Sequence, residues 1–210
     1  MHWIDPDHLP KTNGVVDRFL INPHGEIDGI LLADDLEVHV PPHLSAEIRA
    51  AVKPGATLAV YGVRSRHAEM IAAVAIEADS GRRIVDNGPP NKERKHPKQH
   101  DAGHKHRQAP HSVLEAEGIV RRPLHGPKGE VRGALLEDGR IIRVPPHEAE
   151  ERATLLQAGA GLAARGPGIV VDGATVIDAR EFGASMAVLQ PVRPKALKGD
   201  KKRPETPKYV

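Results

Sequence analysis

The chain has 210 residues, no cysteine, 30 Lys and Arg against 28 Asp and Glu, and a formal net charge of +2. The lack of cysteine excludes disulfides, thiolate metal sites and a cysteine nucleophile, and aromatic residues at 2% leave Val, Ile, Leu and Ala to build a core. No apolar run approaches the roughly 18 residues of a membrane span, and residues 1–13 lack the apolar stretch of a signal peptide, so we expect a cytoplasmic protein without membrane contact.

Two stretches of the sequence repeat each other at one fixed offset. Residues 14–62 align with residues 118–166 without a gap, and roughly twenty of about fifty positions are identical, more than chance gives at a single offset. The shared motifs are Pro-x-Gly-Glu, Gly-x-Leu-Leu-x-Asp and Val-Pro-Pro-His. The sequence therefore predicts an internal duplication, in which each residue of the first copy has an equivalent in the second.

Apolar runs and turn residues predict the first two strands of each copy. The β-branched run at residues 15–21 predicts a strand that ends at the turn Asn22-Pro23-His24-Gly25. A second strand is expected at residues 26–32, where Gly29 indicates a bulge or a sharp bend.

A tight hairpin and a third strand follow in the chain. Asp34-Asp35, and Asp138-Gly139 in the second copy, predict a type I′ turn. The alternation of polar and apolar residues over 37–40 predicts a strand with Glu37 and His39 on its outer face.

A helix and two further strands complete each copy. The Pro-Pro pair ends the third strand, and the apolar spacing over residues 44–52 predicts a helix, for which Ser45 is a candidate N-cap. The Lys-Pro-Gly sequence ends this helix, and strands are expected at residues 57–63 and 70–78. The predicted order is β-β-β-α-β-β.

This order, with a glycine in the second strand and a helix between strands three and four, resembles the OB-fold, a five-stranded Greek-key barrel. The motifs Gly-Glu-Ile-Asp-Gly-Ile-Leu-Leu, Val-His-Val-Pro-Pro-His and Lys-Pro-Gly resemble those of a little-characterised group of bacterial OB-like proteins with a Pro-Pro-His motif, which implies no catalytic residues. The expected fold class is all-β with one short helix per repeat, as two tandem five-stranded OB-like barrels. An SH3-like barrel is the competing fold, and the central helix counts against it.

The segments predicted from the repeat differ in charge. They are an N-terminal extension (1–13), barrel 1 (14–79), a basic His-rich flexible linker (80–117), barrel 2 (118–183) and a basic disordered tail (184–210). Lys and Arg against Asp and Glu number five against ten in barrel 1, nine against nine in barrel 2, eight against five in the linker and seven against two in the tail. The positive excess therefore lies in segments whose Pro, Lys and Gly content is typical of disorder.

The OB-fold binds oligonucleotides on the outer face of strands two and three, and the repeat identifies those positions. Copy one has Asp28, Glu37 and His39 there, whereas copy two has Arg132, Ile141 and Arg143, with Arg165 in place of Tyr61. An acidic face repels the nucleic-acid backbone, so barrel 2 is expected to contact phosphates. The candidate nucleic-acid-binding residues are Arg122, Arg132, Arg143 and Arg165 in barrel 2, Lys92, Arg94 and Lys95 in the linker, and Lys201, Lys202 and Arg203 in the tail.

Few aromatic side chains are available to stack bases. Phe19 and Phe182 are interpreted as core or edge packing rather than stacking platforms. Binding is therefore expected to be mainly electrostatic, low in sequence specificity and sensitive to salt.

Histidines recur in two places. His43 and His147 stand in the Pro-Pro-His corner of both copies, and their recurrence on copies of different charge favours a structural role over a ligand or proton-transfer role. In the linker, His100, His104 and His106 could bind Zn²⁺, Ni²⁺ or Cu²⁺, but the surrounding Lys and Arg oppose a dedicated metal site.

The sequence contains no Gly-rich phosphate loop with its lysine, no HExxH pattern and no Gly-x-Ser-x-Gly elbow, so no enzymatic activity and no cofactor are expected. The leading hypothesis is a non-enzymatic nucleic-acid-binding protein with single strands preferred to duplexes. A protein-interaction or scaffold module is the first alternative, favoured by acidic barrel 1 and the scarcity of aromatics. Histidine-mediated binding of divalent metal is the second.

Overall fold

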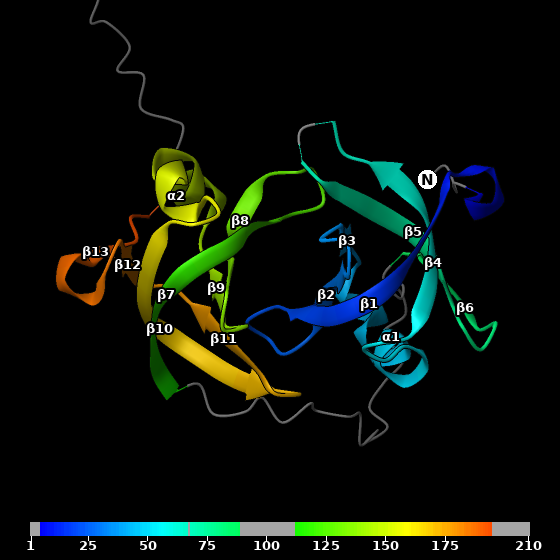
Figure 1. Ribbon diagram of the computed structural model, residues 1–210, viewed down its shortest axis with the longest axis horizontal. Helices are drawn as coiled ribbons and strands as arrows, with labels where there is room; N and C mark the ends of the chain where they lie inside the picture. Colours follow the sequence, from blue (N-terminus) through cyan, green and yellow to red (C-terminus); the bar gives the residue numbers. More distant parts are fainter. Residues whose placement is uncertain (1–4, 67, 89–111, 195–210) are drawn as a thin grey trace, which may run out of the picture.

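The computed structural model describes residues 5–66, 68–88 and 112–194 of the chain. Within these ranges the chain forms two closed β-barrels that lie side by side, the first coloured blue through cyan to blue-green and the second green to orange in Figure 1. None of the described residues belongs to a helix long and apolar enough to cross a membrane.

Five strands close barrel 1. They are β1 (Lys11–Ile21), β2 (Ile27–Leu32), β3 (Glu37–His39), β4 (Thr57–Arg64) and β5 (Met70–Ala78). A parallel pairing between β3 and β5 closes the antiparallel order β3-β2-β1-β4-β5, and β6 (Arg83–Val85) adds an edge strand. The turn η2 (Pro42–Leu44) and helix α1 (Ser45–Ala51) lie between β3 and β4, and the turn η1 (Pro6–His8) precedes β1.

Barrel 2 repeats this order. Its strands are β7 (Ser112–His125), β8 (Val131–Leu136), β9 (Ile141–Arg143), β10 (Gly161–Val171) and β11 (Ala174–Asp178), closed by the pairings of β11 with β9 and β10. Helix α2 (Pro146–Glu151) and the turn η3 (Ala153–Leu156) separate β9 from β10. Beyond β11 the sheet continues through β12 (Glu181–Gly183), η4 (Met186–Val188) and β13 (Gln190–Pro191). The expected fold class, all-β with two tandem OB-like barrels, is confirmed.

Strand β1 and its partner β2, which contains Gly29, lie close to the ranges predicted from the sequence. β1 begins at Lys11 rather than residue 15, because its first residues pair with β4. The irregularity expected at Gly29 is present. In the β1–β2 pair Leu20 lies opposite Gly29, but the next residue, Ile21, lies opposite Ile27, so the register shifts at this point.

The predicted type I′ hairpin after β2 is wrong. A type I′ turn needs a positive φ at both central residues, whereas only Asp35 of this described hairpin has one, at 63°. The Leu32 amide donates to the Leu36 carbonyl at 3.0 Å, which encloses a three-residue loop. Asp35, the third residue of this loop, adopts the left-handed conformation, and its equivalent Gly139 in barrel 2 does the same with φ 90°.

Ser45 does not cap helix α1 as predicted. No side-chain cap bond is present at this helix start. Instead the Ser45 Oγ accepts the Ile27 amide at 2.8 Å, and the serine is buried. Its hydroxyl therefore ties the helix to the start of β2, which explains why a polar residue is tolerated there.

Alternate residues of the barrel 2 strands fill its interior. Val120, Leu136, Ile142, Leu162 and Phe182 are at most 1% exposed and belong to one cluster. The interpretation of Phe182 as a core residue is confirmed.

A second buried cluster crosses from one barrel into the other, along a surface that we call the seam. Leu20 and Leu31 of barrel 1 pack in the same cluster as their equivalents Leu124 and Leu135 of barrel 2, and all four are at most 1% exposed. Because burying each leucine contributes about 1.5–3 kcal/mol, the barrels form one packed unit.

The seam has an internal two-fold relation. Asp17 Oδ2 lies 3.2 Å from the Arg121 guanidinium, and Arg121 is the equivalent of Asp17 in the second copy. Gly25 lies against β10, and its equivalent Gly129 lies against the β4–β5 hairpin. Contacts between equivalent positions are typical of a two-fold dimer, so the duplication has produced a dimer-like arrangement within one chain.

Candidate functional site

Arg143 lies inside the seam rather than on an open face. Its guanidinium donates to the Ile21 carbonyl at 3.0 Å and to Asp28 Oδ1 at 2.6 Å, and the residue is only 8% exposed. The expected exposure of Arg143 is therefore wrong, because barrel 1 covers the outer face of β9.

Arg122 and Glu37 are buried in the same seam. The Glu37 carboxylate, in a residue 2% exposed, accepts the His125 amide at 2.9 Å, His125 Nδ1 at 2.8 Å and the Arg122 guanidinium at 3.5 Å. Arg122 also donates to the Asp35 carbonyl. Arg122 was expected at an accessible surface for nucleic acid and Glu37 on the outer face of its strand; both are buried, because each is covered by the other barrel.

The two remaining candidate arginines of barrel 2 lie at the surface, each beside a carboxylate. Arg132 Nε is 3.2 Å from Glu130. Arg165 contacts Glu115 at 2.7 Å and Glu181 at 3.2 Å, and these contacts raise its pKa above the usual arginine value. Arg132 and Arg165 are accessible, but their charge is partly neutralised.

The other sequence candidates fall outside the described residues. They are Lys92, Arg94 and Lys95, Lys201, Lys202 and Arg203, and the metal candidates His100, His104 and His106. Among the residues that are described, no group of three or more His, Asp or Glu side chains could hold a metal ion.

The two corner histidines contact residues that follow their barrels in the chain. His43 Nε2 lies 3.1 Å from Asp86 Oδ1, just after β6. His147 Nε2 lies 2.8 Å from the Arg193 carbonyl, next to the buried Glu148, which accepts the Arg193 amide at 2.9 Å. Desolvation opposes ionisation of Glu148, but the hydrogen bonds from Arg193 and Arg152 prevail and lower its pKa. Both corners therefore bind the chain that follows the barrel.

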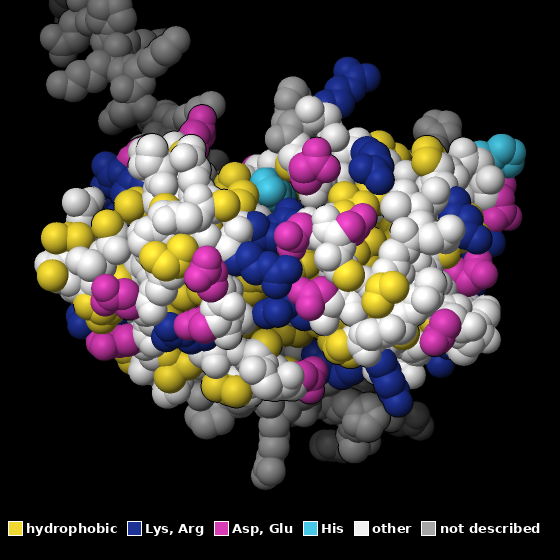
Figure 2. Space-filling model, viewed as in Figure 1, with side chains coloured by type: hydrophobic (Ala, Val, Ile, Leu, Met, Phe, Trp, Pro, Cys, Tyr) yellow, Lys and Arg dark blue, Asp and Glu magenta, His cyan; other side chains and the backbone are white. Residues whose placement is uncertain are grey.

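Figure 2 shows where charge gathers on one face of the molecule. Lys and Arg side chains run along the junction of the two lobes, with Asp and Glu on either side. This band agrees with the ion pairs of the seam, among them Arg121 with Asp17 and Asp35.

Two clefts open beside the seam, and the repeat relates them. Cleft 1, of about 500 Å³, is lined by residues that include Arg18, Phe19, Asp138 and Arg140. Cleft 2, of about 660 Å³, is lined by residues that include the equivalents Arg122, Pro123, Asp34 and Leu36. Each cleft is bounded by the first strand of one barrel and by two hairpins of the other, and cleft 1 is bounded in addition by Arg49 of α1 and by residues 52–54 after this helix. The duplication therefore made one cleft twice, and the two copies have diverged.

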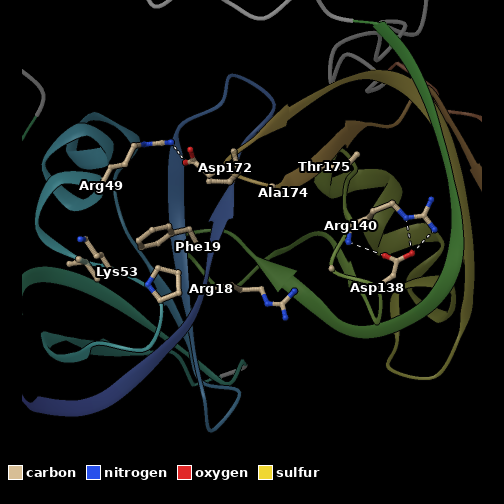
Figure 3. Close-up of a pocket in the computed structure, with 14 residues that line it drawn as sticks. Arg18, Phe19, Arg49, Lys53, Asp138, Arg140, Asp172, Ala174 and Thr175 are labelled. Atoms are coloured by element: carbon tan, nitrogen blue, oxygen red, sulfur yellow. Dashed lines mark hydrogen bonds and ion pairs between the residues drawn. The ribbon is translucent and has the colours of Figure 1, made fainter.

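Cleft 1 combines cations with an aromatic ring. Four basic side chains line it, against two acidic ones: Arg18, Arg49, Lys53 and Arg140, with Asp138 and Asp172. Arg49 bonds to Asp172, and Arg140 lies 2.7 Å from Asp138, whose pKa this hydrogen bond lowers. Figure 3 shows Phe19 and Lys53 together on the barrel 1 wall, while Arg18 points across toward barrel 2.

Lys53 and Phe19 of cleft 1 are functional candidates that the sequence did not identify. Within the described part of the chain Lys53 has no ion-pair partner, and Phe19 is half-buried. Phe19 was interpreted as core or edge packing, and it does pack against the buried seam cluster while also lining cleft 1. The first copy has Phe19 where the otherwise similar second copy has Pro123, and this difference could have indicated that the two positions have different roles.

The His39 ring is expected to make the stability of the seam depend on pH. Burial lowers the pKa of His39 below 6.5, although Asp28 and Glu37 act in the opposite direction. The unfolded chain then binds the proton more readily, so the free energy of unfolding should fall as the pH drops below 6.5 toward the lowered pKa. Urea unfolding measured across this pH range should show the decline, and His39→Gln should flatten it.

The exposed His24 provides the matched control for His39. His24→Gln should leave the pH dependence unchanged, and an equal flattening by both variants would contradict the assignment. Asp28 acts with the opposite sign at lower pH: burial raises its pKa above 3.8 despite Arg143, so its protonation favours the fold.

Comparisons with known proteins add little. The sequence matches no family model, and no curated protein matches it. The expected resemblance to the bacterial Pro-Pro-His group therefore stays a prediction. Among solved structures, the chain is similar to a deletion mutant of the single-stranded DNA-binding protein from Thermus aquaticus, with 13% identity and a TM-score of 0.25 over 90% of this chain and 96% of that one. A TM-score this low supports neither a fold nor a function, and the OB-like assignment depends on the protein's own strand order and barrel closure.

Proposed function

We propose that the protein binds single-stranded nucleic acid with low sequence specificity and without enzymatic activity. The observation that carries the proposal is cleft 1, which is lined by four basic side chains and a half-buried phenylalanine. Cations neutralise phosphates, and an aromatic ring stacks on bases that only a single strand exposes.

The location of this contact differs from the one expected from the OB-fold. The outer faces of β2–β3 and β8–β9 carry the seam, as the burial of Glu37 and Arg143 shows. A strand would instead enter beside the seam, and the exposed Arg132 and Arg165 together with the basic segments 80–117 and 184–210 would extend the contact electrostatically.

The proposal predicts saturable binding that weakens with salt. Fluorescence anisotropy of labelled single-stranded and duplex DNA and RNA, titrated with the full chain, should show tighter binding to single strands. The logarithm of affinity should fall linearly with the logarithm of salt concentration, with a slope of about −0.7 per phosphate contacted. Equal affinity for duplexes would assign binding to charge alone, and no binding at low salt would refute the proposal.

A scaffold function is the second candidate. The face-to-face burial of the OB outer surfaces produces a rigid two-barrel body, and Val113 and Val170 of barrel 2 are 71% and 62% exposed. Recovery of one stoichiometric protein partner after nuclease treatment, combined with no nucleic-acid binding, would favour this function.

A further inference from the structure

Comparison of the two clefts shows that a carboxylate that pairs with an arginine in cleft 2 has no equivalent in cleft 1. In cleft 2, the Arg122 guanidinium meets the Glu37 carboxylate across the seam, 3.5 Å away. The equivalent of Arg122 in cleft 1 is Arg18, and the equivalent of Glu37 is Ile141. Ile141 is apolar and 1% exposed, so Arg18 receives no carboxylate from that position.

Among the described residues, the ion-pair partner of Arg18 is a carboxylate that it shares with Arg121. The Arg18 Nε lies 3.1 Å from Asp17 Oδ2, and the same oxygen is 3.2 Å from Arg121. One carboxylate thus serves two guanidinium groups, of which Arg121 also contacts Asp35 at 2.7 Å. The Arg18 side chain is 34% exposed, so it retains donors that an anion entering cleft 1 can occupy.

The groups around Arg18 select a particular class of anion. A planar guanidinium matches phosphate geometry, and Lys53 on the same cleft adds a cation that is unpaired within the described residues. The half-buried Phe19 provides an apolar aromatic surface for a base. Cleft 2 has Pro123 in place of this ring and adds the acidic Asp35.

We propose that cleft 1 is a nucleotide subsite, with a phosphate on Arg18 and a base against Phe19, and that cleft 2 has lost this capacity. The subsite rests on the proposed single-strand function, and one nucleotide is the unit of the strand that cleft 1 anchors. A free nucleoside monophosphate carries the same chemistry and is expected to enter the same cleft with lower affinity.

The test compares matched variants of the two clefts in the full chain. Arg18→Gln and Phe19→Leu alter cleft 1. The matched variant in cleft 2 is Arg64→Gln, because Arg64 lines that cleft, is exposed and has no ion pair among the described residues. Anisotropy with a labelled single-stranded oligonucleotide should show about 5- to 150-fold weaker binding for Phe19→Leu. Arg18→Gln should weaken binding at least about 10-fold and reduce the salt slope by about 0.7.

Controls separate the subsite from general electrostatics and from misfolding. Arg64→Gln should change affinity less than about 2-fold, and Arg18→Lys should recover part of the loss because it restores the charge. Thermal melting should show each variant folded; Phe19→Leu keeps an apolar side chain at that position. Displacement of the oligonucleotide by adenosine 5′-monophosphate, but not by inorganic phosphate at equal concentration, would support the base contact.

The outcomes distinguish the subsite from the proposed function. Oligonucleotide binding by the wild type with equal effects of Arg18→Gln, Phe19→Leu and Arg64→Gln would overturn the subsite and leave nucleic-acid binding intact. No oligonucleotide binding, with Phe19-dependent binding of the monophosphate, would overturn the proposed function and support the subsite. Failure of both probes would overturn both.

Discussion

Replacing Glu37 by leucine is expected to lower the free energy of unfolding by about 3–5 kcal/mol, the cost typical of leaving one partner of a buried ion pair unpaired. Glu37 is 2% exposed, and its carboxylate accepts the His125 amide and ring and faces the Arg122 guanidinium. In Glu37→Leu the His125 amide and ring lose this acceptor, and the buried Arg122 guanidinium keeps backbone carbonyls but no carboxylate. Urea unfolding followed by circular dichroism measures the loss.

The rescue variant is suggested by the repeat. Position 141, the equivalent of Glu37, already holds a buried isoleucine, so an apolar side chain can pack at such a site. Glu37→Leu combined with Arg122→Met should recover part of the lost stability, because the unpaired guanidinium is replaced by an apolar side chain, while the His125 amide and ring still lack their acceptor. A loss below about 1 kcal/mol in the single variant would show that the pair contributes little to the seam.

Truncating Leu124 to alanine is expected to cost about 2–5 kcal/mol, the range for a buried leucine. Leu124 is 0% exposed and belongs to the cluster that contains the core of barrel 1. Because the seam joins the barrels, the loss should appear in both. Hydrogen exchange should accelerate in β1 and β2 as well as in barrel 2, within one unfolding transition.

Ile119 serves as the matched surface control for Leu124. It lies on the same strand, β7, and is 43% exposed, so Ile119→Ala should change stability by less than about 0.5 kcal/mol. Two separate transitions, with faster exchange confined to barrel 2 in Leu124→Ala, would contradict the shared cluster.

The elements of each barrel were predictable because local patterns and the repeat agree. Residues 70–78 form β5 over the predicted range, and the helix ends at Ala51, before the Lys-Pro-Gly sequence. Alternation correctly separated the inner Val38 from the outer Glu37. The role of Ser45 was predicted wrongly because a serine at the start of a helix can cap the helix or bond to another part of the chain. Only the three-dimensional packing shows that its hydroxyl accepts the Ile27 amide.

The seam was not predicted because alternation shows only which side of a strand faces its own barrel. Asp28 and Glu37 were interpreted as repelling phosphate, and Arg143 as attracting it. The acidic Asp28 and Glu37 on this face of one copy and the basic Arg143 on the same face of the other were nevertheless a usable pattern, because oppositely charged faces attract each other. Cleft 1 depends on the seam, so it could not be predicted before the barrels were placed together.

The contact between Asp17 and Arg121 has a consequence for how the two halves recognise each other. These residues occupy equivalent positions and meet across the two-fold relation, so a pair of identical first halves would set aspartate against aspartate, and a pair of second halves arginine against arginine. Like charges disfavour both homotypic pairings, whereas the mixed pairing brings opposite charges together. Because both halves belong to one chain, their contacting faces need not be the same, and this charge pair favours contact between the two different halves over contact between two equal ones.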